Sequence, residues 1–91
     1  MISLVWDGGE GGALVSLAAD GAVTARSARA FAPGSRPTGT LATGDPFRMK
    51  THRCRREARD DGLTFTIEGR TLDLTRELAS RITAMLSATE G

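Results

Sequence analysis

Turn-forming residues recur at short intervals along the first two thirds of this chain and limit the length of the elements between them. They cluster at residues 7–12, 20–21, 30–39, 44–46 and 59–62. Eleven of the 91 residues are glycine, a content that favours a β fold with many turns over a helical bundle. The glycines at 7–12 lack the Lys-Ser/Thr pair or following helix of a nucleotide loop, so we interpret this segment as a hairpin loop.

One strand–turn–strand pattern occupies residues 14–23. Side chains along 13–18 suit a pleated, half-buried strand. Asp20 and Gly21 follow, and this pair tolerates the positive φ that a tight hairpin turn requires. The pattern predicts a β-hairpin with its turn at Asp20-Gly21.

Further strands are predicted before and after this hairpin, at residues 2–6, 22–28, 38–43, 47–58 and 63–67. In the last of these we expect Leu63, Phe65 and Ile67 to be buried, with Thr64 and Thr66 pointing outward. The segment 59–62 between the last two strands has the chemistry of a hairpin turn, which explains its two aspartates.

The period of the apolar residues changes near the C-terminus. Five of them recur at helical spacing: Leu74, Leu78, Ile82, Met85 and Leu86. Asp73 or Thr75 is suited to cap the start of this helix, and residues 87–91 are expected to fray. Such a stripe can either bind a partner or cover the core of its own domain. We favour the second alternative, in which Leu78 and Ile82 are buried against the barrel.

Together these elements predict one domain spanning residues 1–91, with five to seven short strands and a single C-terminal helix. The strand spacing favours a small antiparallel β-barrel that the helix seals on one side. Aromatic residues are scarce, so the core is expected to be mostly aliphatic. They are Trp6, Phe31, Phe47 and Phe65.

The element order, with its long basic strand and final helix, resembles the PilZ domain, whose fold is a six-stranded antiparallel barrel with a C-terminal helix. The resemblance covers most of residues 13–86 and is carried by pattern more than by identity. The family's first hairpin carries Asp/Asn-x-Ser-x-x-Gly. Gly21 matches that motif, whereas Ser16 stands in place of the Asp or Asn and Ala18 in place of the Ser.

The departures from the family pattern bear on the ligand. PilZ domains that bind cyclic di-GMP use an Arg-x-x-x-Arg pair before the first strand, whose guanidinium groups grip phosphates and stack on guanine. The first arginine here is Arg26, beyond the hairpin, and Ala18 has no hydroxyl. Arg55 and Arg59 have the Arg-x-x-x-Arg spacing, but they lie in the wrong strand, far beyond the segment that carries this motif in the family. The resemblance therefore implies a regulatory or adaptor domain that binds a protein partner, as family members without the motif do, some in type IV pilus assembly. The alternative is an unconventional cyclic di-GMP receptor that uses the basic strand 48–56.

Positive charge is concentrated in residues 48–59, where six basic residues and Glu57 give +5 in a chain of net charge +1. The candidate anion or acidic-partner residues are Arg48, Lys50, Arg53, Arg55 and Arg56. Strict alternation puts Arg48, Lys50 and Arg56 outward with His52 and Cys54. Arg53 and Arg55 then lie with Phe47 and Met49, which indicates an open barrel end or a β-bulge. A solvated face that protects a sheet edge is the alternative explanation.

Other function classes find little support in the sequence. No aromatic residue lies within the basic run, so we do not expect nucleic-acid binding. Cys54 and His52 are the only residues of their kinds, so this pair supplies at most two metal ligands, methionine is the only other soft donor, and no metal or cofactor is expected. No catalytic set can be assembled, so we do not expect an enzyme. Without a signal peptide or an apolar span, we expect a cytoplasmic protein with no membrane contact.

Overall fold

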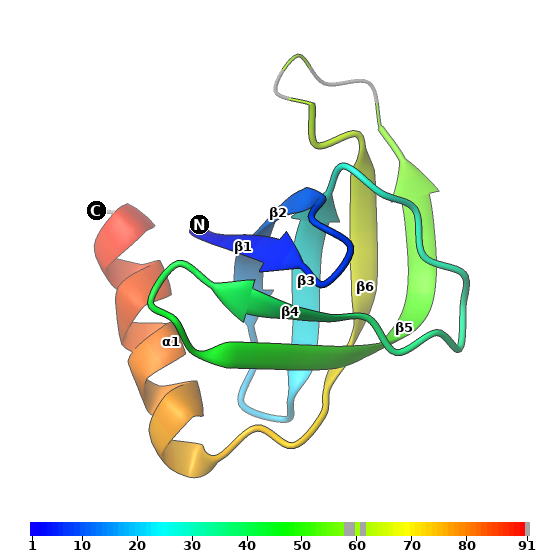
Figure 1. The fold of residues 1–91 in the computed structure, drawn as a ribbon. Coiled ribbons are helices and arrows are strands. Elements are labelled where there is room, and N and C mark those ends of the chain that lie inside the picture. Colours follow the sequence, from blue (N-terminus) through cyan, green and yellow to red (C-terminus); the bar gives the residue numbers. More distant parts are fainter. Residues whose placement is uncertain (58–59, 61, 91) are drawn as a thin grey trace.

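Six antiparallel strands close into a barrel and one helix follows them (Figure 1). The computed structural model describes residues 1–57, 60 and 62–90, with side chains up to residue 87. The elements are β1 (Ile2–Trp6), β2 (Gly11–Leu17), β3 (Ala22–Ser27), β4 (Thr38–Leu41), β5 (Pro46–Arg56), β6 (Phe65–Thr71) and α1 (Arg76–Glu90). The order around the barrel is β1-β2-β3-β6-β5-β4, and β4 closes it by pairing with β1. The predicted fold class is confirmed.

The predicted hairpin is formed by β2 and β3, and Gly21 in its turn has a φ of 91°. The Ala22 amide donates to Oδ1 of Asp20 at 3.0 Å, which fixes the turn locally. β2 begins at Gly11, inside the segment predicted as a loop. Gly12 lies within this strand, at a position where a Cβ would lie 2.9 Å from both Trp6 Nε1 and the Arg26 carbonyl oxygen. Glycine here permits close strand packing rather than a turn.

β5 ends two residues before the predicted boundary, and Ala58 lies outside the described residues. The pairing between β5 and β6 shifts between Thr51 and Arg53, so His52 is a bulged residue. The bulge reverses the alternation after it. Cys54, which was predicted to point outward, instead pairs with buried Ile67 and is half-buried.

The return strand also differs from its predicted extent, since β6 covers Phe65–Thr71 and leaves half-buried Leu63 outside it. Phe65 is half-buried rather than buried. Thr66, predicted to point outward, is only 7% exposed. Its neighbours across the sheet are Arg26 and Arg55, and we attribute its burial to the aliphatic stems of these side chains.

Two further strands are shorter than predicted, because β3 ends at Ser27 and β4 at Leu41. The Leu41 amide donates to the Asp45 carbonyl at 2.8 Å, which turns the chain directly after β4. The predicted 59–62 turn lies partly outside the described residues.

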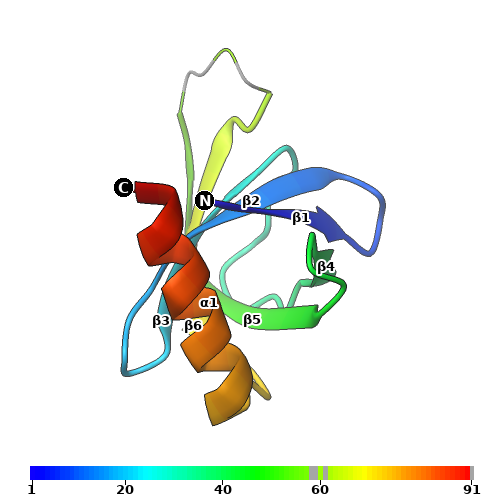
Figure 2. The same ribbon diagram turned by 90° about the vertical axis from the view of Figure 1, so that its left-hand side faces the viewer.

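Thr75 caps α1, because its Oγ1 accepts a hydrogen bond from the Leu78 amide at 3.1 Å. Asp73 has a φ of 55° and lies in the turn before the helix. Ile82 and Leu86 are buried, as expected for the apolar stripe, whereas Leu78, also predicted to be buried against the barrel, packs against the core but is only half-buried. The helix continues through the segment expected to fray and ends at Glu90. Figure 2 shows it lying along one side of the barrel.

The core is one mostly aliphatic cluster, as predicted, with contributions from every strand and from α1. Trp6 is its largest fully buried side chain and meets Phe31 edge-on with ring centroids 4.9 Å apart. Ser27, also buried, accepts a hydrogen bond from Trp6 Nε1 at 2.9 Å. Within the described part of the chain, no helix has the length and apolar character needed to span a bilayer.

Candidate functional site

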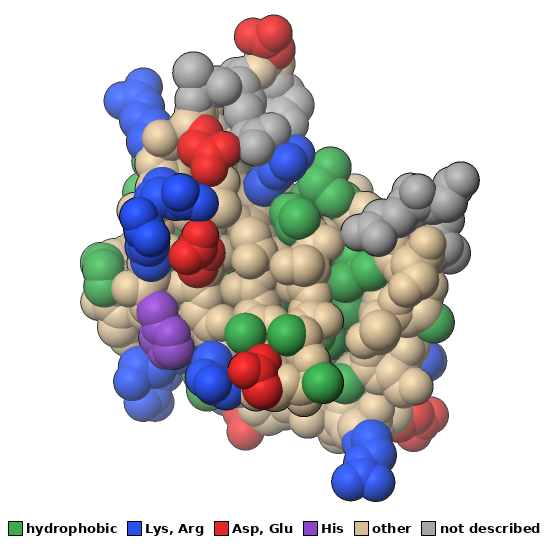
Figure 3. Space-filling view, turned by 180° about the vertical axis from the view of Figure 1, so that it is seen from behind, with side chains coloured by type: hydrophobic (Ala, Val, Ile, Leu, Met, Phe, Trp, Pro, Cys, Tyr) green, Lys and Arg blue, Asp and Glu red, His purple; other side chains and the backbone are tan. Residues whose placement is uncertain are grey.

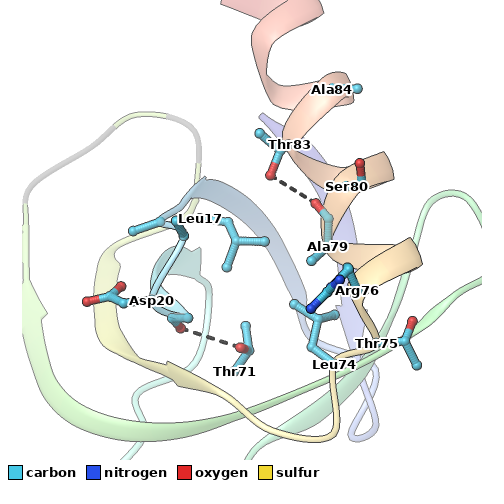
Figure 4. Close-up of a pocket in the computed structure, with 13 residues that line it drawn as sticks. Leu17, Asp20, Thr71, Leu74, Thr75, Arg76, Ala79, Ser80, Thr83 and Ala84 are labelled. Atoms are coloured by element: carbon cyan, nitrogen blue, oxygen red, sulfur yellow. Dashed lines mark hydrogen bonds between the residues drawn. The ribbon is translucent and has the colours of Figure 1, made fainter.

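A groove of about 720 Å³ separates the β2–β3 hairpin from the first part of α1 (Figure 4). Leu17 faces Ala79 across it, whereas the Asp20 side chain points away from α1. The lining consists mainly of apolar and small side chains, with hydroxyl groups from α1. It is formed by residues 17–21, Thr71, Leu74, Thr75, Arg76, Ala79, Ser80, Thr83 and Ala84.

The hairpin wall of this groove is attached to β6 by hydrogen bonds. The Thr71 amide donates to the Gly21 carbonyl at 3.0 Å. Arg70 Nη1 donates to the Asp20 carbonyl at 2.7 Å. The opposite wall is positioned by the Thr75 cap and by Ile82, which anchors α1 in the core. Both walls are therefore held by the fold, and the space between them is part of the folded structure.

The two charged residues that line the groove differ in whether they have an ion-pair partner within the described part of the chain. Asp20 and Arg76 are the charged residues of its described lining. Arg70 lies 3.8 Å from the Asp20 carboxylate and partly neutralises it. No ion pair is found for Arg76 among the described residues, so the charge left available at this groove is positive.

The hairpin positions singled out by the PilZ resemblance divide between two surfaces. Gly21 and Ala18 border the groove beside α1. Ser16 is exposed and lies in a smaller depression of about 320 Å³ on the outer face of the barrel, which Ala18 also borders. His52, Arg53 and Glu68 contribute to that depression from β5 and β6. The fold thus brings Ser16 to the same surface as part of the basic strand.

The five basic candidates do not form one uniform surface. Arg48 makes a 2.7 Å ion pair with Asp73, and Arg55 lies 3.0 Å from Glu68 and 3.8 Å from Glu57. Figure 3 shows blue and red side chains interleaved around the purple histidine on the face seen from behind. Among the described residues, local acids therefore pair with two of the five candidates, Arg48 and Arg55.

The bulge also corrects the predicted grouping of outward residues. Lys50 pairs across the sheet with exposed Arg70, and Arg53 pairs with Glu68, so both point outward. Arg55 follows on that side, opposite Thr66. Arg56 instead pairs with Phe65, which packs against the core, so the expectation that Arg56 shares a face with Arg48 and Lys50 was wrong.

The two potential soft metal ligands do not converge. His52 is exposed at the bulge, whereas Cys54 is half-buried toward the core. Within the residues that the structure describes, no three His, Cys, Asp or Glu side chains gather as a metal site would require.

Sequence analysis missed the part of the groove supplied by α1. Arg76, Ser80 and Thr83 lie off the apolar stripe of the helix, yet these residues line the groove together with Ala79 and Ala84. A signal was present in the sequence, because small residues at helical spacing run beside the apolar stripe.

Comparisons of this chain with family models, curated proteins and solved structures found no match. The chain is a small six-stranded antiparallel barrel with a C-terminal helix, and its function must be argued from its surfaces.

Proposed function

We propose that this chain is a PilZ-like regulatory or adaptor domain of bacterial signalling or motility that acts by binding a protein partner. The observation that carries the proposal is the groove between α1 and the β2–β3 hairpin. Concave sites with apolar walls and a few polar groups are the usual places where proteins hold a ligand or an anchoring side chain.

The apolar side chains of the groove support a partner site. Leu17 and Leu74 pack against the core but remain half-buried, so each keeps apolar surface beside the groove. Ala18 and Ala84 are exposed at its edges. A partner side chain placed between the walls would remove this surface from water, at roughly 25 cal/mol per Å² of apolar area.

The positions and pairing of the arginines argue against cyclic di-GMP binding by the site that the PilZ family uses. Arg55 already pairs with Glu68. The first arginine of the chain is Arg26, and Ala18 supplies no hydroxyl. Charge-assisted hydrogen bonds are worth roughly 1.5–3 kcal/mol each, so losing several lowers affinity by orders of magnitude. The protein-binding role of family members without the ligand motif fits this chain better.

The proposal is tested by filling the groove. Ser80 is exposed on α1 and lines the groove, so Ser80→Trp should block it without disturbing the core. Glu77→Trp is the matched control, since Glu77 is exposed on the same helix outside the lining. Tagged wild-type and variant chains are expressed in the native cell, and co-purified proteins are quantified by mass spectrometry.

We expect a partner that the wild type and Glu77→Trp retain and that Ser80→Trp loses. Equal recovery of every partner by all three chains would reject the groove as the binding site.

The smaller depression on the outer face of the barrel favours a second candidate, an unconventional cyclic di-GMP receptor. It places the Ser16 hydroxyl on the same surface as Arg53, which has no ion pair among the described residues. A guanidinium and a hydroxyl can hold a phosphate, and the Glu68 carboxylate can accept hydrogen bonds from a guanine edge.

Isothermal titration with cyclic di-GMP separates the two candidates. The adaptor role predicts no saturable heat at micromolar concentrations. Saturable heat that is lost in Arg53→Ala would support the second candidate instead.

A further inference from the structure

We infer that the partner segment held in this groove is acidic and apolar, with an apolar side chain between Leu17 and Leu74 and a carboxylate at Arg76. This inference rests on the proposed function and deepens it, because it names the chemistry of the partner. The apolar side chain and the carboxylate of the partner would contact different residues of the groove.

The apolar part follows from the two walls. Leu17 at the end of β2 and Leu74 before α1 are both half-buried and line the groove. The facing side chains of α1, Ala79 and Ser80, are small and let another chain approach the helix closely. A branched or aromatic side chain inserted there would be covered on both sides.

The acidic part follows from the charges. The Asp20 carboxylate already accepts a hydrogen bond from the Ala22 amide and lies 3.8 Å from Arg70. Arg76, across the groove, has no ion pair among the described residues. It also begins α1, where the positive end of the helix dipole disfavours a cation and favours an anion. An incoming carboxylate would be attracted by both charges.

The length of the groove limits the segment. Its lining on the α1 side runs from Thr75 to Ala84. At about 1.5 Å per helical residue this is roughly 13 Å, the length of about four extended residues. A short linear segment fits this length, with an acidic residue at the Arg76 end and an apolar residue farther along.

Selection from a random 12-residue peptide display library tests the inference. Wild-type protein is the bait, and Ser80→Trp is used for counter-selection, so that only peptides that need the groove are kept. The binding of the enriched peptides is then measured by fluorescence anisotropy on wild type, Arg76→Gln and Arg53→Gln. Arg53 is the matched control, because it is an exposed arginine outside this groove.

We expect the enriched peptides to combine acidic and apolar residues. Their affinity should fall about fivefold in Arg76→Gln, the upper range for an exposed ion pair, and should not change in Arg53→Gln. The fivefold difference should shrink at high salt.

Two kinds of result would overturn the inference. One is a set of enriched peptides with the wrong chemistry: they are neutral or basic, or they are acidic but bind Arg76→Gln as tightly as wild type. The other is the absence of any peptide that needs the groove. Neither result decides the proposed function, which depends on whether Ser80→Trp loses a native partner.

Discussion

Truncating Ile82 to alanine should destabilise the whole domain, because this side chain anchors α1 in the barrel core. Ile82 is 1% exposed and belongs to the same apolar cluster as Leu14 and Met49. Replacing a fully buried isoleucine by alanine costs about 2–5 kcal/mol, through lost burial and the cavity that remains. A domain of this size has about 5–15 kcal/mol of stability in total, so the loss is a large fraction of it.

Leu78→Ala provides the matched comparison on the same helix. Leu78 is only half-buried, so part of its surface is already in contact with water. We expect a loss of about 1–2 kcal/mol, below the range for a fully buried leucine. The difference between the two variants therefore reflects mainly how deeply each side chain is buried, since the helix propensities of isoleucine and leucine differ by only a few tenths of a kcal/mol.

Thermal unfolding followed by circular dichroism measures both variants. Each kcal/mol lowers Tm by about 4–8 °C for a domain of this length, so Ile82→Ala should lose at least about 8 °C. Urea unfolding should show a lower midpoint with an unchanged slope if the transition stays two-state. Equal stability of Ile82→Ala and wild type would refute the docking of α1 on the core, and with it one wall of the groove.

Three further predictions follow from close contacts and charges. Gly69→Ala should cost about 1–3 kcal/mol, because its Cβ would lie 1.9 Å from the Lys50 carbonyl oxygen; a denaturation midpoint equal to wild type would contradict this. Ser27→Ala should cost about 1–3 kcal/mol, since it leaves the buried Trp6 indole N–H without its acceptor; this is measured by urea unfolding. Arg53→Ala should change unfolding by less than about 0.5 kcal/mol in the same assay, because Arg53 is exposed and outside any ion pair among the described residues.

Local patterns were enough to predict the fold class. The turn at Asp20-Gly21 needs a positive φ, and Gly21 adopts one of 91°. The change from a period of two to a helical period separates β6 from α1, and buried Ile82 lies in the predicted stripe. These features depend on neighbours in the sequence, so they can be found without knowledge of tertiary contacts.

The errors arise where distant segments meet. The bulge at His52 occurs where β5 passes Gly69, and it decides which of the later side chains face outward. Nothing in residues 47–58 alone specifies the place of that extra residue, although the arginines on the expected apolar side indicated a bulge or an open end. The burial of Thr66 likewise depends on arginines from two other strands.

The groove could not be predicted for a related reason. Its walls come from the hairpin at residues 17–21 and from α1, more than fifty residues apart in sequence. The amphipathic pattern of the helix identifies the face that packs on the core. It does not tell which of the remaining faces lies beside another element and which is open to water. Arg76 and Glu77 both lie off the apolar stripe, and the pattern does not separate them, although only Arg76 lines the groove.

Folding weakens the positive charge of residues 48–59, which is the strongest charge feature of the sequence. The groove is therefore a better candidate for partner binding than the basic strand. Residues 48–59 carry +5, but the fold supplies acids to them from elsewhere in the chain. Asp73 pairs with Arg48, and Glu68 pairs with Arg55. Exposed pairs of this kind contribute little stability, but they lower the positive potential that would steer an acidic partner. Arg76 is a single cation, yet it lies beside apolar walls where a partner side chain can be buried. A charge next to a concave apolar surface can contribute to both affinity and specificity, whereas a charge already paired with an acid on an open sheet contributes less to either.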